Sequence, residues 1–515
     1  MYPDTNRESR QHATQATAII TRGVPFVTDS TETTDPREVL ETRDETFRTD
    51  LESLLAQPSI SATDEGVTEC ASMVQELCLE YGFDEAETVK TPGQPAVIAH
   101  AAANRGGEAR EEAADDDDNS QDAPTILLYG HYDVQPATPE EWDSPPFEPT
   151  VREGPDGEQR LYARGAGDNK GQWFAHVCAV RALRETTGLP ANVVLLIEGE
   201  EESGSEHLEW LVREHRDELA CDVAVVADGP IDSSGRPHVL LGARGLLYVD
   251  LELRGANQDL HSGNFGGPVP NPAAALTDLL ASLEDDGRVT LDGFYDDVRP
   301  LTDRGQEIVA EIPVDEDEIR DELALDAFET DADENYVERL LTRPNLNVAG
   351  LDAGYHGDGM KTVLPSKASA KIDFRLVADQ DPDAIYEALV DYAEAHVPAG
   401  VEIELSRVAA MAPQRTPADS PVVEPAMRAT RDGWGTEPIL KPTLGGSVPT
   451  YVFADNLDVP CLVIPYANED ERNHAPNENL KLSCFRAGAR TTVALLSEFA
   501  EADLSDPSSS ASTST

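Results

Sequence analysis

Short apolar runs and helical patterns alternate along the first half of the chain. Residues 125–130, 191–197 and 222–227 are nearly unbroken apolar stretches, which is typical of strands buried on both faces. Residues 172–184 lie between the first two runs and have the pattern of a helix, as do residues 63–79, where apolar side chains recur with helical spacing. Strands that alternate with helices predict an α/β fold with a mostly parallel central sheet flanked by helices.

The pattern changes after residue 228. Residues 246–254 and 368–377 alternate between apolar and polar positions, as expected for strands with one exposed face. An amphipathic helix is expected at 381–396 and a short strand at 401–406. Together these elements predict an α+β domain that is inserted into the first domain.

The end of the chain returns to the pattern of the first domain. Helical patterns at 420–432 and 480–504 flank an apolar strand expected at 457–465. Two domains also suit a chain of 515 residues. The predicted organisation is a loose N-terminal extension (1–36), the first part of the main domain (37–238), the inserted domain (239–410), the second part of the main domain (411–504) and a disordered tail (505–515).

Residues 104–122 interrupt the main domain with a polar stretch that contains consecutive aspartates at 115–118. We expect a solvated, disordered loop, because such a composition cannot bury enough apolar surface to fold. A charged hairpin tip is a better interpretation than an ion site. We therefore assign this loop no chemical role.

The chain carries 99 acidic against 39 basic residues, a formal net charge of −60. Self-repulsion of this size destabilises a compact state in dilute buffer, whereas at about 1 M salt the Debye length is only ~3 Å. We therefore expect a protein from a halophilic organism, adapted to a salt-rich cytoplasm. An acidic surface for a basic partner is the alternative, but the acids are spread along the whole chain. Nucleic-acid binding is not expected, because phosphates would be repelled.

Neither the N-terminus nor the cysteines indicate secretion or a membrane. The first ten residues are polar and charged, and no stretch approaches the ~18 uninterrupted apolar residues of a membrane span. The six cysteines are scattered without metal-type spacing, so buried structural thiols in a reducing compartment are expected. A cytoplasmic protein without a membrane partner follows.

Charged or histidine side chains follow each of the three buried strands. His131 follows the first apolar run, Glu201 and Glu202 follow the second, and Asp228 follows the third. Because ligands of parallel sheets bind outside the carboxyl ends of the strands, we expect these side chains on one rim. Imidazoles and carboxylates are the ligands that a pair of divalent cations needs.

Three further residues could complete such a site. Asp133 lies two residues after His131 and could orient its ring through a hydrogen bond. Asp168 lies among glycines, where the backbone can approach closely, and His474 lies in a polar loop. Singly, each has an ordinary alternative, such as a turn aspartate, a solvated acidic loop or a surface histidine. Their joint occurrence in a chain with only 11 histidines favours a metal site.

Five stretches of the sequence together resemble a known family. They are GHYDVQP around His131, RGAGDNKG around Asp168, EGEEESGS at 198–205, DLHSGNFGG around His261 and GGSVP from Gly445. They resemble motifs of metallopeptidase family twenty, which includes aminoacylase, acetylornithine deacetylase, succinyl-diaminopimelate desuccinylase, glutamate carboxypeptidase and the carnosine-type dipeptidases. The resemblance spans about residues 36–504, and HYDVQP, DNKG and EESGS look most similar to the dipeptidase branch.

The resemblance implies a zinc-peptidase-like catalytic domain and a ferredoxin-like inserted lid through which the family forms homodimers. It also implies two divalent metal ions. His131 and Asp228 then bind one ion, Glu202 and His474 bind the other, and Asp168 bridges both and is followed by a cis peptide bond. We expect zinc first, with manganese or cobalt as alternatives, because mixed imidazole and carboxylate sites accept all three.

The resemblance further implies the roles of the residues around the metals. Glu201 is the general base and acid, and Asp133 orients a ligand. His261 reaches into the site of the partner subunit and stabilises the oxyanion. Arg375 and the segment Gly445, Gly446 and Ser447 hold the substrate carboxylate. Without the resemblance, Arg375 could equally well form a surface salt bridge instead of binding substrate. His261 would then be better interpreted as an ordinary histidine in a turn than as a residue of the site.

These residues predict a metallohydrolase that cleaves the amide bond of dipeptides or short peptides with a free C-terminal carboxylate. A deacylase of N-acyl amino acids is the alternative, because the metal centre would be the same and only the substrate pocket would differ. A non-catalytic metal-binding or scaffold protein is a third interpretation. Glu201 argues against it, because a binding module needs no carboxylate beside the ligands.

Overall fold

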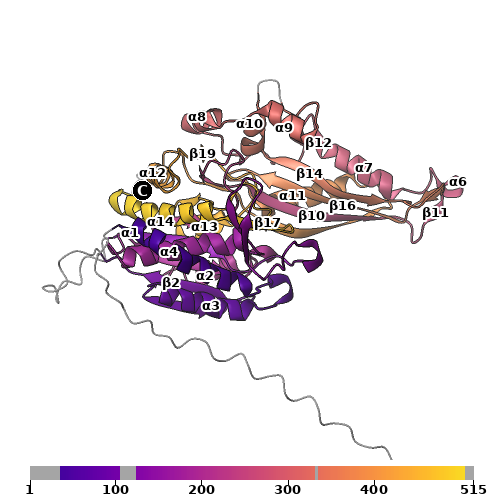
Figure 1. The fold of residues 1–515 in the computed structure, drawn as a ribbon. Coiled ribbons are helices and arrows are strands. Elements are labelled where there is room, and N and C mark those ends of the chain that lie inside the picture. The colour runs from indigo at the N-terminus through magenta and orange to yellow at the C-terminus, as the bar shows by residue number, and fades with distance from the viewer. Residues whose placement is uncertain (1–34, 105–122, 331–333, 505–515) are drawn as a thin grey trace, which may run out of the picture.

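The computed structural model describes residues 35–104, 123–330 and 334–504 of the chain. The predictions for the N-terminal extension, the acidic loop and the C-terminal tail fall almost entirely outside these residues. Two large sheets dominate the described part of the chain, and helices pack against both (Figure 1).

The larger sheet has eight strands, and its four central strands run parallel to one another. In spatial order the strands are β1 (Glu85–Val89), β2 (Ala96–Ala101), β6 (Asn192–Glu198), β3 (Thr125–His131), β7 (Val223–Val226), β20 (Cys461–Val463), β8 (His238–Leu240) and β19 (Ile439–Lys441). Antiparallel pairs occur at β1 with β2, β2 with β6 and β20 with β8. The predicted mostly parallel sheet is confirmed.

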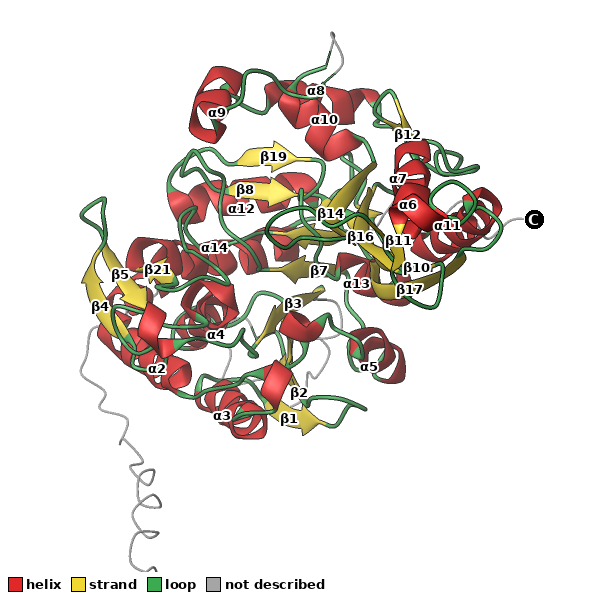
Figure 2. Ribbon diagram, turned by 90° about the vertical axis from the view of Figure 1, so that its right-hand side faces the viewer, coloured by secondary structure: helices red, strands yellow, loops and turns green. Residues whose placement is uncertain are grey.

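Alternate side chains of β3 enter separate apolar cores on the two faces of this sheet. Ile126 and Leu128 join the core that contains side chains of α3, α4, α12 and α14, while Leu127 and Tyr129 join the core of α5 and α13. Figure 2 shows α4 and α14 on one side of β3 and β7, with α5 and α13 on the other. Burial on both faces explains why the strand sequences are nearly unbroken apolar runs.

The helices around the larger sheet have these bounds: α1 (Pro36–Thr42), α2 (Asp44–Ala56), α3 (Val67–Glu80), α4 (Gly171–Arg184), α5 (Leu208–Glu214), α12 (Val423–Trp434), α13 (Thr450–Leu457) and α14 (Leu482–Glu501). The helices predicted at 63–79, 172–184, 420–432 and 480–504 are thus present, each with slightly different ends.

The smaller sheet has four antiparallel strands in the order β14 (Asn345–Ala353), β16 (Lys367–Leu376), β10 (Gly245–Arg254) and β17 (Glu402–Met411). With α7 (Pro272–Ser282) and α11 (Pro382–His396), the chain order of these elements is β-α-β-β-α-β, which is the ferredoxin-like pattern. Leu247 and Leu251 of β10 share one core with Leu276 of α7 and Leu389 of α11. Both helices therefore cover the same face, as the alternating strands predicted.

Each of the two helices of the smaller sheet begins at a proline that follows a capping side chain. Asn271 accepts a hydrogen bond from the N–H of Ala273, and Asp381 accepts one from the N–H of Asp383. Such a cap satisfies a backbone N–H that has no partner inside the helix, and proline suits the first helical position. The sequence therefore sets where both helices start.

Several short elements were not expected from the sequence. They include β1, β8, β19, α5 and α13 and also α6 (Ser262–Phe265), α8 (Asp303–Glu311), α9 (Glu316–Leu323), α10 (Tyr336–Thr342), β4 (Thr150–Glu153), β5 (Gln159–Tyr162), β9 (Gly242–Ala243), β11 (Leu260–His261), β12 (Glu284–Asp285), β13 (Arg288–Val289), β15 (Val363–Leu364), β18 (Gln414–Arg415) and β21 (Asn479–Lys481). Most contain too few residues to show a clear hydrophobic period. The longer elements β14 and α7 were not expected either.

All six cysteines lie in the described part of the chain, where each is a free thiol and all but Cys221 are buried. This agrees with the expectation of buried structural thiols. Across residues 35–104, 123–330 and 334–504, we find no helix with the length and apolar character that crossing a bilayer requires.

Candidate metal centre

Three adjacent strands of the larger sheet bring acidic and histidine side chains to one rim. His131 is the last residue of β3, and Asp228 follows β7 by two residues. Glu201 and Glu202 begin a short 3-10 helix (Glu201–Ser203) that follows β6. Because β6, β3 and β7 are neighbouring parallel strands, their carboxyl ends lie together. The structure thus gathers the residues that the sequence placed after the buried strands.

Asp168 lies between the two histidines and directs one oxygen to each of them. Its Oδ1 is 3.1 Å from Nε2 of His131, and its Oδ2 is 3.1 Å from Nε2 of His474. Nε2 of His474 is also 3.0 Å from Oε2 of Glu202. On the other side, Nε2 of His131 is 4.0 Å from Oδ2 of Asp228. The peptide bond that follows Asp168 is cis, as the resemblance implied.

Two groups of potential metal ligands share Asp168. One consists of His131, Asp168 and Asp228, and the other of Asp168, Glu202 and His474. Within each group the ligand atoms all lie within 4.8 Å of one another. Atoms that bind one ion at about 2 Å lie within roughly 4 Å of each other, so only small movements would close each group on a cation. The donor set therefore fits a pair of divalent ions with one shared carboxylate.

The protonation of these groups reflects crowding of negative charge. Burial raises the pKa of Asp228 to about 7, and the charge of Asp168 adds to this shift. Hydrogen bonds to Asp168 and Glu202 raise the pKa of His474 to about 10. Burial by itself would lower the pKa of His131, but hydrogen bonds to the carboxylates of Asp133 and Asp168 outweigh this effect. The pKa of His131 is therefore raised well above its usual value. Carboxylates this close together repel one another unless cations neutralise them, which is further support for the fit.

Glu201 lies beside both ligand groups but belongs to neither. Its Oε2 is 3.9 Å from Nε2 of His131. Burial raises the pKa of Glu201 well above its usual range, and the charges of Asp228 and Asp168 add to the shift. A carboxyl group next to a metal site whose pKa is raised in this way is suited to accept and return a proton.

Asp133 connects the loop after β3 to the loop after β6. Its Oδ1 lies 3.4 Å from Nδ1 of His131. Its two oxygens accept hydrogen bonds from the backbone N–H groups of Glu201 and Glu202, at 3.2 and 3.1 Å. The sequence suggested only the contact with His131. In the structure this fully buried carboxylate positions residues of both ligand groups.

Asn169 was not singled out from the sequence, although it links two of the strand ends. Its side chain accepts a hydrogen bond from the N–H of His131 at 3.1 Å. It also donates to the carbonyl of Ala227 at 2.7 Å and to Oδ1 of Asp228 at 3.2 Å. This one amide therefore holds the ends of β3 and β7 at a set distance.

Gln135 and Glu478 also support ligands and were missed. Gln135 donates its side-chain amide to Oε2 of Glu202 at 2.9 Å. Glu478 accepts the N–H of Asp168 at 3.0 Å and forms a buried ion pair with Arg164 at 2.7 Å. Each of the two lies within four residues of a predicted site residue, and that nearness was the available sequence signal.

Arg375 lies in β16 of the smaller sheet and contacts a loop of the main domain. Its Nη1 donates to Oγ of Ser447 at 3.2 Å, and its Nε donates to Asp373 at 3.3 Å. Gly445 and Gly446 precede Ser447 in this loop, and a Cβ at either position would meet only leucine atoms at 3.8 Å or more. The structure therefore brings Arg375 together with Ser447, while nearby atoms do not require glycine at 445 or 446.

His261 is not part of this cluster within the chain. It is exposed at the end of β11, which pairs with β15, and its Nδ1 accepts a hydrogen bond from the N–H of Gly263. Figure 1 places β11 and α6 at the end of the smaller sheet that lies farthest from the larger sheet. Any role of His261 in the metal centre would thus require a second copy of the chain.

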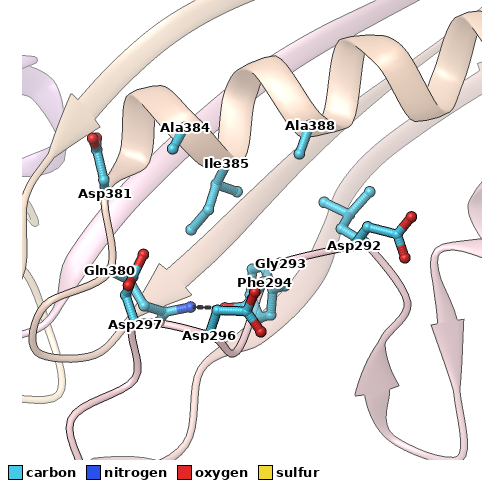
Figure 3. A pocket seen from close by; sticks show the side chains of 11 residues that line it. Asp292, Gly293, Phe294, Asp296, Asp297, Gln380, Asp381, Ala384, Ile385 and Ala388 are labelled. Carbon is cyan, nitrogen blue, oxygen red and sulfur yellow. Dashed lines mark hydrogen bonds between the residues drawn. The ribbon is translucent and has the colours of Figure 1, made fainter.

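A separate hollow of about 210 Å³ lies beside α11 (Figure 3). Its walls come from residues 291–297 and 380–388, and several aspartates line it. The hollow includes no residue of the predicted metal centre. In a chain this acidic, such a cluster is not by itself a binding site.

The chain is similar to known proteins over most of its length. The human Beta-Ala-His dipeptidase is 32% identical over 388 residues, which cover 73% of this chain and 75% of that protein. The Cys-Gly metallodipeptidase of Saccharomyces cerevisiae is 30% identical over 388 residues, or 73% of this chain and 79% of that protein. The crystal structure of an M20 family metallo-carboxypeptidase from Sulfolobus solfataricus is 35% identical, with a TM-score of 0.77, covering 88% of this chain and 99% of that one.

The family match includes both ligand groups. Residues 127–498 match the family described as Peptidase family M20/M25/M40, and this range contains His131, Asp168, Glu202, Asp228 and His474. The matched range also includes both sheets apart from β1, β2 and the first two residues of β3. The shared motifs, the fold and the paired ligand groups agree, and the chain belongs to peptidase family M20/M25/M40.

Proposed function

We propose that the chain hydrolyses the peptide bond of dipeptides or short peptides with a free C-terminal carboxylate. The observation that carries the proposal is the position of Asp168, whose two oxygens face different histidines beside the carboxyl group of Glu201. The dipeptidase activity named for the human and yeast relatives supports the choice of substrate.

In this proposal His131, Asp168 and Asp228 hold one divalent ion, and Asp168, Glu202 and His474 hold the second. When bound, two such ions polarise the scissile carbonyl and make water at the site more acidic. Zinc is the first candidate, with manganese and cobalt as alternatives, because the ligand set does not discriminate strongly among them.

The proposed roles of the other side chains follow from their positions. Glu201 takes a proton from the attacking water and returns it to the departing amine. Asp133 keeps the ring of His131 and the backbone of Glu201 in place. Arg375, with Ser447 beside it, binds the substrate carboxylate, since a guanidinium can hold a carboxylate by two parallel hydrogen bonds.

We further propose a homodimer in which His261 acts in the site of the other copy. The support is that His261 is exposed and ends β11, which Figure 1 places at the end of the smaller sheet farthest from the larger sheet. An imidazole that arrives from the second copy would donate a hydrogen bond to the oxyanion.

The net charge of −60 supports a third proposal, that the protein works in a salt-rich cytoplasm.

A carboxypeptidase that removes the last residue of longer peptides is the second candidate. The similarity to the Sulfolobus solfataricus metallo-carboxypeptidase favours it, and both activities need a free C-terminal carboxylate. The two differ in whether a free amino group must lie close to the scissile bond.

One assay separates these functions. The purified protein is stripped with a chelator, reloaded with zinc, manganese or cobalt in high salt, and offered four substrate types: free dipeptides, N-blocked dipeptides, longer peptides and N-acetyl amino acids. We expect metal-dependent cleavage of free dipeptides. Preference for N-blocked or longer peptides would favour the carboxypeptidase, and preference for acetylated amino acids would favour a deacylase. Full activity in the presence of a strong chelator would exclude all three.

A further inference from the structure

Lys170 is a fully buried lysine that lies two residues after the shared ligand Asp168. Among the described residues its ammonium contacts backbone carbonyls rather than a carboxylate, although acids greatly outnumber bases in this chain. Burying an ammonium without a counter-charge is costly unless hydrogen bonds satisfy it. The surroundings of this side chain therefore indicate what it contributes.

The ammonium of Lys170 is hydrogen-bonded to backbone carbonyls at the end of α2. Nζ donates to the carbonyl of Gln57 at 2.7 Å and to that of Leu54 at 3.2 Å. These carbonyls belong to the C-terminal end of the helix, where the helix dipole favours a positive charge. Two backbone carbonyls thus accept two of the three N–H donors of the lysine.

The segment that receives these hydrogen bonds also holds the loop of His131. Ser59, two residues after Gln57, donates from Oγ to the carbonyl of Tyr132 at 2.6 Å. Its carbonyl accepts the N–H of Val134 at 2.9 Å. Residues 57–59 therefore contact Lys170 on one side and both neighbours of Asp133 on the other.

We propose that Lys170 is a positioning residue that fixes the shared ligand Asp168 relative to His131 by tying both of their loops to residues 54–59. This inference rests on the proposed metal centre and adds a residue that sets its geometry. Metal–ligand distances tolerate changes of only about 0.2 Å, so a small shift of the Asp168 turn would weaken both groups. Both hydrogen bonds go to backbone carbonyls at the C-terminal end of α2. The connection between Lys170 and residues 54–59 therefore depends on the lysine side chain and not on the side chains of its partners.

The test compares Lys170→Met with Lys441→Met. Methionine keeps most of the side-chain volume at either position and removes the donors. Lys441 is a matched control, because it is a mostly buried lysine paired with Asp232 at 2.6 Å on the edge strand β19. Metal affinity is measured by competition with a chelator, and the unfolding midpoint of the metal-free protein is measured in parallel.

We expect Lys170→Met to raise the metal dissociation constant by about 10- to 100-fold, the usual effect of losing a residue that orients ligands. Lys441→Met should lower the unfolding midpoint and leave metal affinity at the wild-type value. Wild-type metal affinity in Lys170→Met would overturn the inference while leaving the proposed function intact. A wild-type protein that binds no divalent metal would instead overturn the proposed function.

If Lys170→Met does not fold, Ser59→Ala tests the other end of the same link. That variant removes the hydrogen bond to the carbonyl of Tyr132 and keeps the lysine. We expect weaker metal binding in this variant also, with a smaller change because the backbone contact between Ser59 and Val134 remains. Unchanged metal affinity in Ser59→Ala would then count against the inference.

Discussion

Oδ1 of Asp133 lies 3.4 Å from Nδ1 of His131, at the centre of the candidate site. The same carboxylate accepts hydrogen bonds from the backbone N–H groups of Glu201 and Glu202. One buried side chain thus contacts His131 and Glu202, which are potential ligands in different groups, and Glu201, the proposed proton acceptor. A carboxylate can accept on both oxygens, whereas an amide can accept on only one.

Replacing Asp133 by Asn should therefore weaken the metal centre without removing a ligand. We expect metal affinity to fall about 10- to 100-fold, because the ring of His131 loses its charged partner and one backbone N–H loses its acceptor. Metal content after dialysis against graded chelator concentrations measures this effect. Metal retention equal to that of the wild type would show that Asp133 does not position the ligands.

Replacing Glu201 by Gln should separate metal binding from catalysis. Glu201 belongs to neither ligand group, so both ions should remain bound. Turnover should fall by about 10²- to 10⁴-fold, the usual contribution of a general base. Two quantities are measured for the variant and the wild type: the metal content, and kcat on the dipeptide that the wild type cleaves best. Near-normal turnover would remove Glu201 from the proposed mechanism.

Arg375 should affect substrates according to their C-terminal group. Arg375→Met should lower kcat/KM for dipeptides about 10- to 100-fold, since a charge-assisted hydrogen bond contributes roughly 1.5–3 kcal/mol. Dipeptide amides, which have no carboxylate, should be affected much less. Kinetics on each dipeptide and its amide provide the comparison, with Ser447→Ala as a milder variant at the same contact. Equal losses on both substrates would contradict carboxylate binding.

His261 should act between two copies of the chain. His261→Ala alone should lose about 10²- to 10³-fold in kcat, as expected for a lost oxyanion donor, with metal content unchanged. A heterodimer of His261→Ala with Glu201→Gln contains one site with both side chains intact. Mixing the two inactive variants after dissociation should therefore restore activity. Failure of heterodimers to regain activity would place His261 outside the neighbouring site.

Salt should stabilise the folded chain strongly. With a net charge of −60, self-repulsion is large at low ionic strength and is mostly screened near 1 M salt, where the Debye length is ~3 Å. The unfolding midpoint should rise steadily across a KCl series, and secondary structure should be lost as the salt is removed. A midpoint that does not change with KCl would remove the proposed adaptation.

Much of the site could be predicted because strand patterns and strand ends are local features of the sequence. His131 and Asp228 follow buried apolar runs directly, and neighbouring parallel strands place such positions on one rim. Alternation of apolar and polar positions predicted β10, β16 and part of β17 of the smaller sheet, but not β14. It did not anticipate α8, α9 and α10, because helices of seven to nine residues give little periodic signal.

The sequence by itself determined which side chains stand at the strand ends and which faces of the elements are apolar, because both depend on near neighbours in the chain. The resemblance to a known family implied that Asp168 bridges two metal ions. Only the tertiary structure decided that the two oxygens of Asp168 face different histidines, that Asp133 reaches the backbone of Glu201, and that Lys170 reaches the end of α2. These contacts join residues 37 to 306 positions apart. No periodicity encodes them, because they depend on how loops settle once the sheets and helices have packed.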